Sequence, residues 1–238
     1  MTRRRWIADE VSGDRASLTG DHADHLIRVL RARVGDHFDI ATGAAVRRGH
    51  ITSISHGRVD FELSEEIPGD RLSEITLALS IFKFDRMEWA IEKCTELGVS
   101  RIVPVIARRT DSHLASASLK RVERWQRIAR QASEQSRRAV PPDIAAPIKV
   151  TEALKVPGTL RILLSEVEER ALLRDVVKSD VQDTVAVAVG PEGGWTGDEL
   201  RSFQQAGWIS ASLGNTILRA ETAAIAATAI VASVLSSF

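Results

Sequence analysis

The chain is poor in several residue types, and each scarcity excludes a class of protein. It has one cysteine, Cys94, no tyrosine, and only 5% aromatic residues in a length of 238. A single cysteine excludes an intramolecular disulfide, and the position of Cys94 on the apolar side of an expected helix indicates a small core residue. The low aromatic content argues against an extensive base-stacking platform for single-stranded nucleic acid.

Long apolar runs are also absent. The most apolar segment, residues 223–235, is too short and too often interrupted by Ser and Thr to span a bilayer. The N-terminus reads Arg3, Arg4, Arg5 and Trp6, without the apolar stretch of a signal peptide. We therefore expect a soluble, cytoplasmic protein without a membrane partner.

Charge is balanced overall and uneven locally. The chain has 32 Lys and Arg against 32 Asp and Glu. Residues 101–149 hold 11 basic against 4 acidic residues, whereas residues 150–238 hold 7 against 11. A basic middle beside an acidic C-terminal part indicates a face for a polyanion; ordinary solvated helix faces are the alternative.

The hydrophobic pattern predicts two domains. Residues 1–70 contain short strand-like pieces and one short helix that Asp21 is placed to cap, and Pro68-Gly69-Asp70 marks a boundary. Residues 71–238 alternate apolar strands with amphipathic helices, which is the pattern of a parallel α/β sheet. Expected strands are 37–41, 45–54, 58–63, 75–81, 101–106, 159–165, 184–190 and 208–213. Expected helices of the second domain cover 84–97 and 119–132 or start near Glu168, Thr196 and Arg219.

Two glycine-bearing loops follow strands of the second domain. Residues 189–200 read Val-Gly-Pro-Glu-Gly-Gly-Trp-Thr-Gly-Asp-Glu-Leu, and residues 213–224 read Leu-Gly-Asn-Thr-Ile-Leu-Arg-Ala-Glu-Thr-Ala-Ala. Ligands of parallel sheets bind at the carboxyl ends of strands, and glycine lets the main chain approach a ligand closely. The loops therefore predict a pocket lined by main chain; the alternative is that both are only tight connections.

Neither loop carries a common phosphate fingerprint. The stretch 190–194 lacks the Gly-Lys-Ser/Thr ending of a P-loop and the spacing of Gly-x-Gly-x-x-Gly. Glu192 suits a cationic or donor-rich ligand better than a diphosphate, or serves only as a carboxylate at a helix N-terminus. His22 and His25 stand three apart, but no Cys or carboxylate cluster completes a ligand set, so we expect no metal.

The motifs taken together resemble the SPOUT methyltransferases, and among them the small-subunit ribosomal RNA (uracil-N3) methyltransferase family, RsmE. The resemblance covers nearly the whole chain. Besides the two loops it rests on His25-Leu26, Arg28-Val29-Leu30-Arg31, Gly35-Asp36, Lys83, Lys93, Glu96-Leu97-Gly98-Val99, Pro104, Glu134-Gln135-Ser136, Arg138 and Pro142. The chain departs from the family pattern at Thr216, Ala220 and Arg137, where Arg, Thr and Gly are usual.

The resemblance implies a fold and a reaction. The C-terminal parallel sheet is expected to carry a trefoil knot, which general topology rules would not predict, and the N-terminal domain to be a small PUA-like β-barrel that binds RNA. The implied activity is methylation of N3 of a uridine in 16S ribosomal RNA by S-adenosylmethionine, with nucleotide 1498 as the family target. The implied partners are the small ribosomal subunit and a second copy of the chain.

From the chemistry of the implied reaction we hypothesise which residues form the site. Arg219 is the candidate for stabilising charge on the uracil oxygens, Arg138 is the second candidate, and Glu221 either orients Arg219 or accepts the proton. The cofactor candidates are Leu164, Ser165, Glu166, Val189, Gly190, Pro191, Glu192, Gly193, Gly194, Leu213, Gly214, Ile217, Leu218, Arg219, Thr222 and Ala223. The candidate RNA phosphate contacts are Arg28, Arg31, Arg109, Lys120, Arg124, Arg127 and Arg138.

Other functions stay open at this point. The same fold can act on another base or on transfer RNA. A non-catalytic RNA-binding assembly factor that has kept the fold is a second alternative. A third is a nucleotide-binding protein that uses the glycine loops for phosphate.

Overall fold

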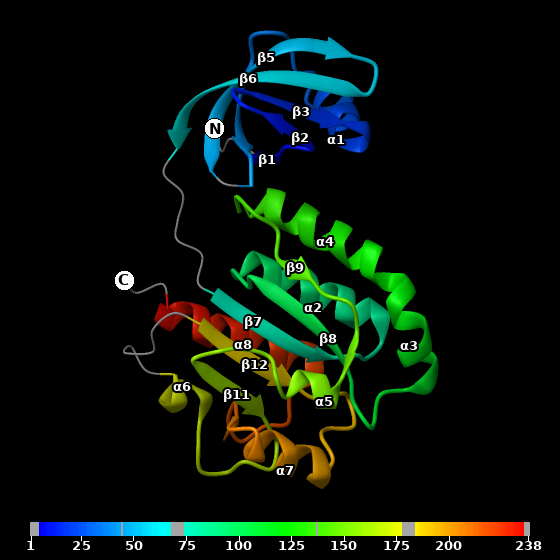
Figure 1. The fold of residues 1–238 in the computed structure, drawn as a ribbon, viewed down its shortest axis with the longest axis vertical. Coiled ribbons are helices and arrows are strands. Elements are labelled where there is room, and N and C mark those ends of the chain that lie inside the picture. The colour runs from blue at the N-terminus through cyan, green and yellow to red at the C-terminus, as the bar shows by residue number, and fades with distance from the viewer. Residues whose placement is uncertain (1–4, 44, 68–73, 137, 178–183, 236–238) are drawn as a thin grey trace. The chain divides into compact units, whose positions relative to one another are not determined.

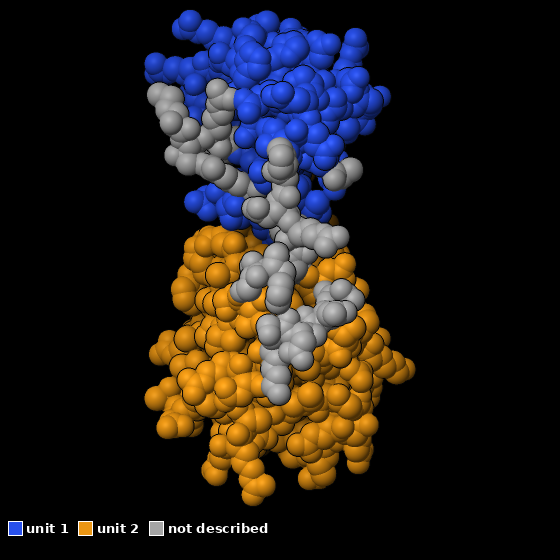
Figure 2. Space-filling view, turned by 90° about the vertical axis from the view of Figure 1, so that its left-hand side faces the viewer, with its two compact units in different colours: residues 1–71, 133–141 blue, residues 72–132, 142–238 orange. Residues whose placement is uncertain are grey.

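The structure, a computed structural model, describes residues 5–43, 45–67, 74–136, 138–177 and 184–235. These residues belong to two compact units, 1–71 with 133–141 and 72–132 with 142–238, which Figure 2 colours separately. The predicted boundary at Pro68-Gly69-Asp70 and the departure at Arg137 lie outside the described residues. The segment 133–141 groups with the first unit although sequence reasoning places it in the second domain.

The first unit is a curled sheet of six strands (Figure 1). Its order is β1-β4-β5-β6-β3-β2; β1 and β4 are parallel and all other neighbours are antiparallel. Register shifts interrupt the pairing of β5 with β6, and such irregularities bend a sheet. The strands are β1 (Arg5–Ile7), β2 (Glu10–Ser12), β3 (Arg15–Thr19), β4 (His37–Ala41), β5 (Val46–Ser55) and β6 (Arg58–Ile67).

The core of this unit forms because alternate strand residues are apolar and face inward. Trp6, Leu18, Ile40 and Phe61 are almost fully buried together. Polar side chains also meet here, because His22 of the helical segment lies 3.5 Å from Asp9 and 3.4 Å from the buried Glu134. Glu134 and Ala139 therefore contact the rest of this unit, Glu134 through His22 and Ala139 through apolar packing.

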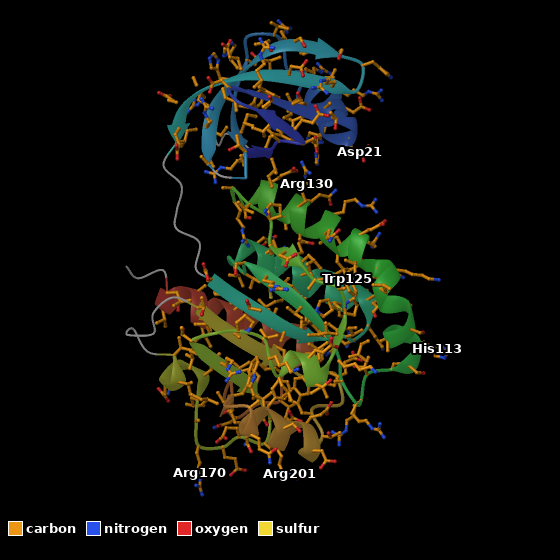
Figure 3. The ribbon with its side chains drawn as sticks, in the orientation of Figure 1. Asp21, His113, Trp125, Arg130, Arg170 and Arg201 are labelled. Atoms are coloured by element: carbon orange, nitrogen blue, oxygen red, sulfur yellow. The ribbon has the colours of Figure 1, made fainter. Side chains whose placement is uncertain are left out.

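The helical segment of the first unit starts differently from the prediction. Helix α1 (Gly20–Asp24) is followed by a π-helical turn, η1 (His25–Val29). The N-cap is Thr19, whose side chain makes no capping hydrogen bond, and Asp21 lies inside the first turn (Figure 3). The predicted Asp21 cap is wrong because Gly20, with φ of +56°, lets the chain turn into the helix earlier.

The second unit is a parallel sheet covered by helices on both faces. The strand order is β10-β8-β7-β12-β11-β13, β9 also pairs with β8, and all of these pairs are parallel. The strands are β7 (Glu74–Ser80), β8 (Arg101–Ile106), β9 (Asp143–Ile144), β10 (Ile148–Lys149), β11 (Leu160–Leu164), β12 (Thr184–Val189) and β13 (Ile209–Ala211). The predicted α/β class with a parallel sheet is confirmed.

Alternate residues of the strands pack into different cores, which explains their nearly continuous apolar sequence. Leu77 and Leu79 of β7 pack with α2 and α8, whereas Ala78 packs with α5 and α7. The helices are α2 (Phe84–Glu96), α3 (Ser112–Ala117), α4 (Val122–Gln135), α5 (Val150–Ala153), α6 (Leu173–Val176), α7 (Gly197–Gln205) and α8 (Ala220–Leu235). Among the described residues, none of the helices has both the length and the apolar character needed to cross a bilayer.

Cys94 lies in the first of these cores, as predicted. It is buried on α2, and the Oγ1 of Thr228 on α8 is 3.5 Å from its sulfur. Burial raises the pKa of the Cys94 thiol to about 12. The thiol is therefore protonated at neutral pH and acts as a small core side chain.

Two helix predictions need correction. No helix starts near Glu168, and α6 begins only at Leu173. The carboxylate of Glu168 accepts hydrogen bonds from the main-chain N–H groups of Arg170 and Ala171, at 2.9 and 3.2 Å, and holds a turn instead. The helix predicted over 119–132 begins as a 3₁₀ turn, η2 (Ser118–Arg121), before α4. The predicted starts near Thr196 and Arg219 are confirmed.

Candidate active site

A pocket of about 530 Å³ opens where β11, β12 and β13 end. Three segments surround it: 164–166 after β11, 189–194 after β12, and 211–220 after β13, with Ala223 of α8. Arg86 of α2 completes the lining. The volume lies within the range of about 300–1,000 Å³ that is usual for small-molecule sites.

The first glycine loop is held rigidly by its neighbours. The indole Nε1 of Trp195 donates to the carbonyl of Leu164 at 3.1 Å. The guanidinium of Arg109 donates to the carbonyl of Gly193 at 2.6 Å. Thr196 and Glu199 form a capping box at the start of α7. These contacts fix the main chain that lines one wall of the pocket.

At two glycines in this loop, a side chain would crowd its neighbours. The N–H of Gly194 donates to the carbonyl of Pro191 at 2.8 Å, and Gly194 has φ of +70°, in the left-handed region. A Cβ at Gly194 would collide with the carboxylate of Glu166. A Cβ at Gly190 would lie 3.1 Å from the indole nitrogen of Trp195. These two glycines therefore let the main chain lie close to Glu166 and Trp195 of the same unit; close approach of the main chain to a ligand stays a prediction.

The second glycine loop carries exposed side chains into the start of α8. The N–H of Ala223 donates to the carbonyl of Arg219 at 2.8 Å, so the helix begins directly after Arg219. The Arg219 side chain is exposed and forms no hydrogen bond or ion pair with any residue that the structure describes. Ile217 also lines the pocket and is 86% exposed.

Glu221 faces Arg86 rather than Arg219. Its Oε1 lies 3.8 Å from Nε of Arg86, and the Glu221 side chain is only 7% exposed. Its Oε2 is buried without a hydrogen-bond partner in the described part of the chain. The same Arg86 donates from Nη1 to Oε1 of Glu192 at 2.8 Å. Orientation of Arg219 by Glu221, one of the two predicted roles, has no contact to support it in this structure.

Almost all predicted cofactor residues come together in the pocket. The exception is Thr222, which is exposed and does not line it. Asn215 and Thr216 also line the pocket and belong to the second loop, which was predicted to line it. Sequence reasoning missed Arg86, Ala211, Ser212 and Ala220. Ala211, Ser212 and Ala220 adjoin or lie inside the second loop, so that loop was the available signal. Arg86 had no such signal, because it lies on a helix more than a hundred residues away.

The second predicted catalytic arginine, Arg138, belongs to the first unit, whereas the pocket is lined by residues of the second unit. It is buried, and desolvation lowers the pKa of its guanidinium to about 10. The group therefore stays charged at neutral pH.

The basic residues predicted to contact RNA differ in whether their side chains already bind another group of the chain. Arg109 holds the glycine loop through Gly193, and Arg124 makes two hydrogen bonds to Glu88, at 2.7 and 2.8 Å. Arg28 lies 3.7 Å from Asp24. Lys120 and Arg127 are exposed on η2 and α4, and Arg31 is exposed in a left-handed conformation with φ of +53°. Lys120, Arg127 and Arg31 are therefore the predicted cations best placed to take a phosphate.

The sequence of this chain is similar to those of known proteins. Residues 70–232 match the family described as RNA methyltransferase domain. The chain is 34% identical over 226 residues to ribosomal RNA small subunit methyltransferase E of Synechocystis, covering 93% of this chain and 74% of that protein. It is also 34% identical over 220 residues to the protein of that name from Rickettsia conorii, covering 89% and 87%.

A solved structure has the same fold and contains a ligand. Ribosomal RNA small subunit methyltransferase E of Neisseria gonorrhoeae, bound to S-adenosyl methionine, is 31% identical, covers 95% of both chains and superposes with a TM-score of 0.82. A methyltransferase from Legionella pneumophila with the same cofactor bound is 26% identical, with 98% coverage of both chains and a TM-score of 0.85. The chain belongs to the ribosomal RNA small subunit methyltransferase E family, RsmE.

Proposed function

We propose that this chain methylates N3 of a uridine in 16S ribosomal RNA, using S-adenosylmethionine bound in the pocket between its two glycine loops. Family membership supports the reaction class, and the 31% identical structure with S-adenosyl methionine supports the cofactor. Uridine at N3, and nucleotide 1498 as the target, rest on the family resemblance. The observation that carries the proposal is the convergence of both loops, with Arg219, on one pocket.

The residues of this pocket fit the proposed cofactor. Leu164, Leu213 and Leu218 supply apolar surface for a purine ring. Gly190, Gly193 and Gly194 contribute only main chain to this lining. Carboxylates of Glu166 and Glu192 line the pocket and suit a ligand that carries a positive charge and hydroxyl donors. When bound, the cofactor supplies a methyl group on a positively charged sulfur.

The chain must then bring the uracil into line and stabilise its charge. Alignment of two reacting centres alone is worth about 7–11 kcal/mol of barrier. N3 of uracil is a poor nucleophile until it loses its proton, and negative charge then grows on the flanking carbonyl oxygens. Arg219 is exposed, lines the pocket and has no partner among the described residues, so its guanidinium is available to those oxygens. We assign Arg219 this role.

Replacement of Arg219 tests the assignment. In Arg219→Ala, turnover on small ribosomal subunits should fall about 10²- to 10³-fold, as when one oxyanion donor is removed. Affinity for S-adenosylmethionine, measured by calorimetry, should stay within a few fold. The matched control is Arg201→Ala, an exposed arginine on α7 that does not line the pocket (Figure 3). Wild-type turnover in the Arg219 variant would remove this residue from the chemistry.

The same measurements separate the alternative functions. A non-catalytic assembly factor should show no heat on addition of S-adenosylmethionine. A phosphate-binding protein should be competed by ATP or NAD but not by S-adenosylhomocysteine. Mass mapping of ribosomal RNA from cells that lack the protein, followed by addition of the purified chain, identifies the base and distinguishes 16S ribosomal RNA from transfer RNA.

We propose that Lys120 and Arg127 of the second unit and Arg28 and Arg31 of the first contact RNA phosphates. Their exposure supports this assignment. The few aromatic residues, 5% of the chain, favour recognition of RNA shape and phosphates over base stacking. We further propose that the curled sheet of the first unit is the PUA-like RNA-binding domain of the family, as an N-terminal partner of a methyltransferase domain over 71–238.

We propose a trefoil knot and a homodimer from the family resemblance. The position of β12 between β7 and β11 supports a chain path that doubles back near the pocket. Ile217 lines the pocket and is 86% exposed, so it offers a position at which the proposed dimer can be tested. Light scattering should report twice the chain mass for the wild type and the chain mass for Ile217→Asp.

A further inference from the structure

Arg86 joins two carboxylates from different loops of the pocket. Its Nη1 donates to Oε1 of Glu192 at 2.8 Å, and its Nε lies 3.8 Å from Oε1 of Glu221. Glu192 lies in the loop between β12 and α7, and Glu221 lies in the first turn of α8. One guanidinium on α2 therefore connects the first glycine loop, through Glu192, with the first turn of α8, through Glu221.

The contact differs from an ordinary surface ion pair. Arg86 is 31% exposed, Glu192 is 38% exposed, and Glu221 is only 7% exposed. Glu221 has a buried Oε2 without a partner in the described part of the chain, so Arg86 supplies its nearest described positive charge. A buried carboxylate without a compensating cation is costly. Arg86 therefore neutralises a charge that the fold places beside the pocket.

The glycine loop has two arginine anchors with different positions. Arg109 grips the carbonyl of Gly193 and does not line the pocket. Arg86 grips the side chain of Glu192 and does line it. Arg86 therefore places a positive charge in the lining of the pocket, whereas the hydrogen bonds of Arg109 go to main-chain carbonyls of the loop.

We propose that Arg86 is a positioning residue of this site: it holds Glu192 and Glu221 in place and sets the net charge that the pocket presents to the positively charged sulfur of the cofactor. This proposal rests on the proposed function. It also leaves Arg219 available to the substrate, because Arg86 rather than Arg219 compensates Glu221.

The test compares S-adenosylmethionine with S-adenosylhomocysteine, which lacks the methyl group and its positive charge. Affinities for both are measured by calorimetry in wild type, Arg86→Met, Arg86→Lys, Glu192→Gln and the Arg86→Met/Glu192→Gln double variant. The arginine forms a charge-assisted hydrogen bond in a partly exposed setting, so its loss should weaken both ligands about tenfold.

The ratio of the affinity for S-adenosylmethionine to the affinity for S-adenosylhomocysteine reports how the pocket responds to the positive charge of the ligand. Arg86→Met leaves Glu192 unopposed and should favour the cationic ligand by about threefold over the neutral one. Glu192→Gln leaves Arg86 unopposed and should shift the ratio in the opposite direction by a similar factor. The double variant should restore the wild-type ratio. Arg86→Lys keeps the charge but loses the fork that reaches two carboxylates, so affinity should fall without a change of ratio.

A second readout separates positioning from folding. Arg86→Met should raise KM for S-adenosylmethionine and leave kcat at saturation within a few fold. The matched control is Arg101→Met, which breaks an ion pair to Asp143 of 3.2 Å in the same unit and away from the pocket lining. It should change neither KM nor the affinity ratio.

Each result has a definite meaning. Affinities within twofold of wild type in Arg86→Met, or an unchanged ratio in both single variants, overturn the inference. If Arg86→Met does not fold, Glu192→Gln alone decides it, because that variant must shift the ratio. A wild-type chain that binds neither ligand overturns the proposed function instead, so the two failures are distinguishable.

Discussion

Gly194→Ala is expected to damage cofactor binding more than folding. Gly194 has φ of +70°, and an alanine there pays about 1–2 kcal/mol for the left-handed conformation. Its Cβ would also collide with the carboxylate of Glu166, with the carboxyl carbon at 3.1 Å. Glu166 is exposed, so its carboxylate can swing aside at little further cost in stability. Glu166 lines the pocket, however, so movement of its carboxylate changes the surface that the cofactor contacts.

Gly98→Ala is the matched control for the backbone cost. Gly98 follows α2, has φ of +100°, and a Cβ there would meet nothing within 4 Å. Both alanine variants should therefore lose a similar 1–2 kcal/mol, which corresponds to a fall in melting temperature of roughly 2–8 °C for a unit of this size. Differential scanning calorimetry of the two variants beside wild type measures this.

Cofactor affinity should separate the two variants. Gly98→Ala should bind S-adenosylmethionine as wild type does, whereas Gly194→Ala should bind about tenfold more weakly, comparable with the loss of one charge-assisted hydrogen bond. The Gly194→Ala/Glu166→Ala double variant should bind no more weakly than Glu166→Ala alone, because both changes remove the same carboxylate. Equal affinity in the two glycine variants, or additive losses in the double variant, would refute this reasoning.

Three further predictions follow from burial and charge. The Cys94 thiol, whose pKa is raised to about 12, should resist iodoacetamide at pH 8 in the folded chain and react after unfolding in guanidinium; rapid labelling of folded protein would contradict its burial. Trp195→Phe should lower the free energy of unfolding by about 1–3 kcal/mol in urea titration, since it leaves the main-chain carbonyl at the end of β11 without its donor; an unchanged midpoint would show that the bond contributes nothing. Arg127→Ala should weaken RNA binding and flatten its salt dependence more than Arg124→Ala, because Arg124 is already held by a carboxylate; equal effects would contradict the ranking.

The glycine loops show how far the sequence predicted the site. Apolar runs that end in Gly190 and near Gly214 indicated strands followed by main-chain turns, and the structure brings both turns to one pocket. This part was predictable because strand ends, glycine and helix caps are local features, each determined by a few consecutive residues. The capping box of Thr196 and Glu199 is an example, since its two members are three residues apart.

Segments in which local signals compete were predicted less well. Glu168 suggested a helix start, but its carboxylate holds a turn over residues 168–171 instead. Asp21 suggested a cap, but Gly20 allows the helix to begin before it. In both cases the residue type is compatible with two local structures, and the surrounding packing selects one of them.

The sequence by itself determined the α/β class of the second unit, the strands that carry the site and the loops that line it, because these follow from patterns over short stretches of chain. Only the tertiary structure decided that Arg86 meets Glu192 across 106 residues, that Glu221 is compensated by Arg86, and that Arg109 serves the loop through Gly193. The physical reason is that an arginine side chain is long and flexible and can reach many partners. Which carboxylate or carbonyl it binds depends on the groups that the folded sheet brings near it.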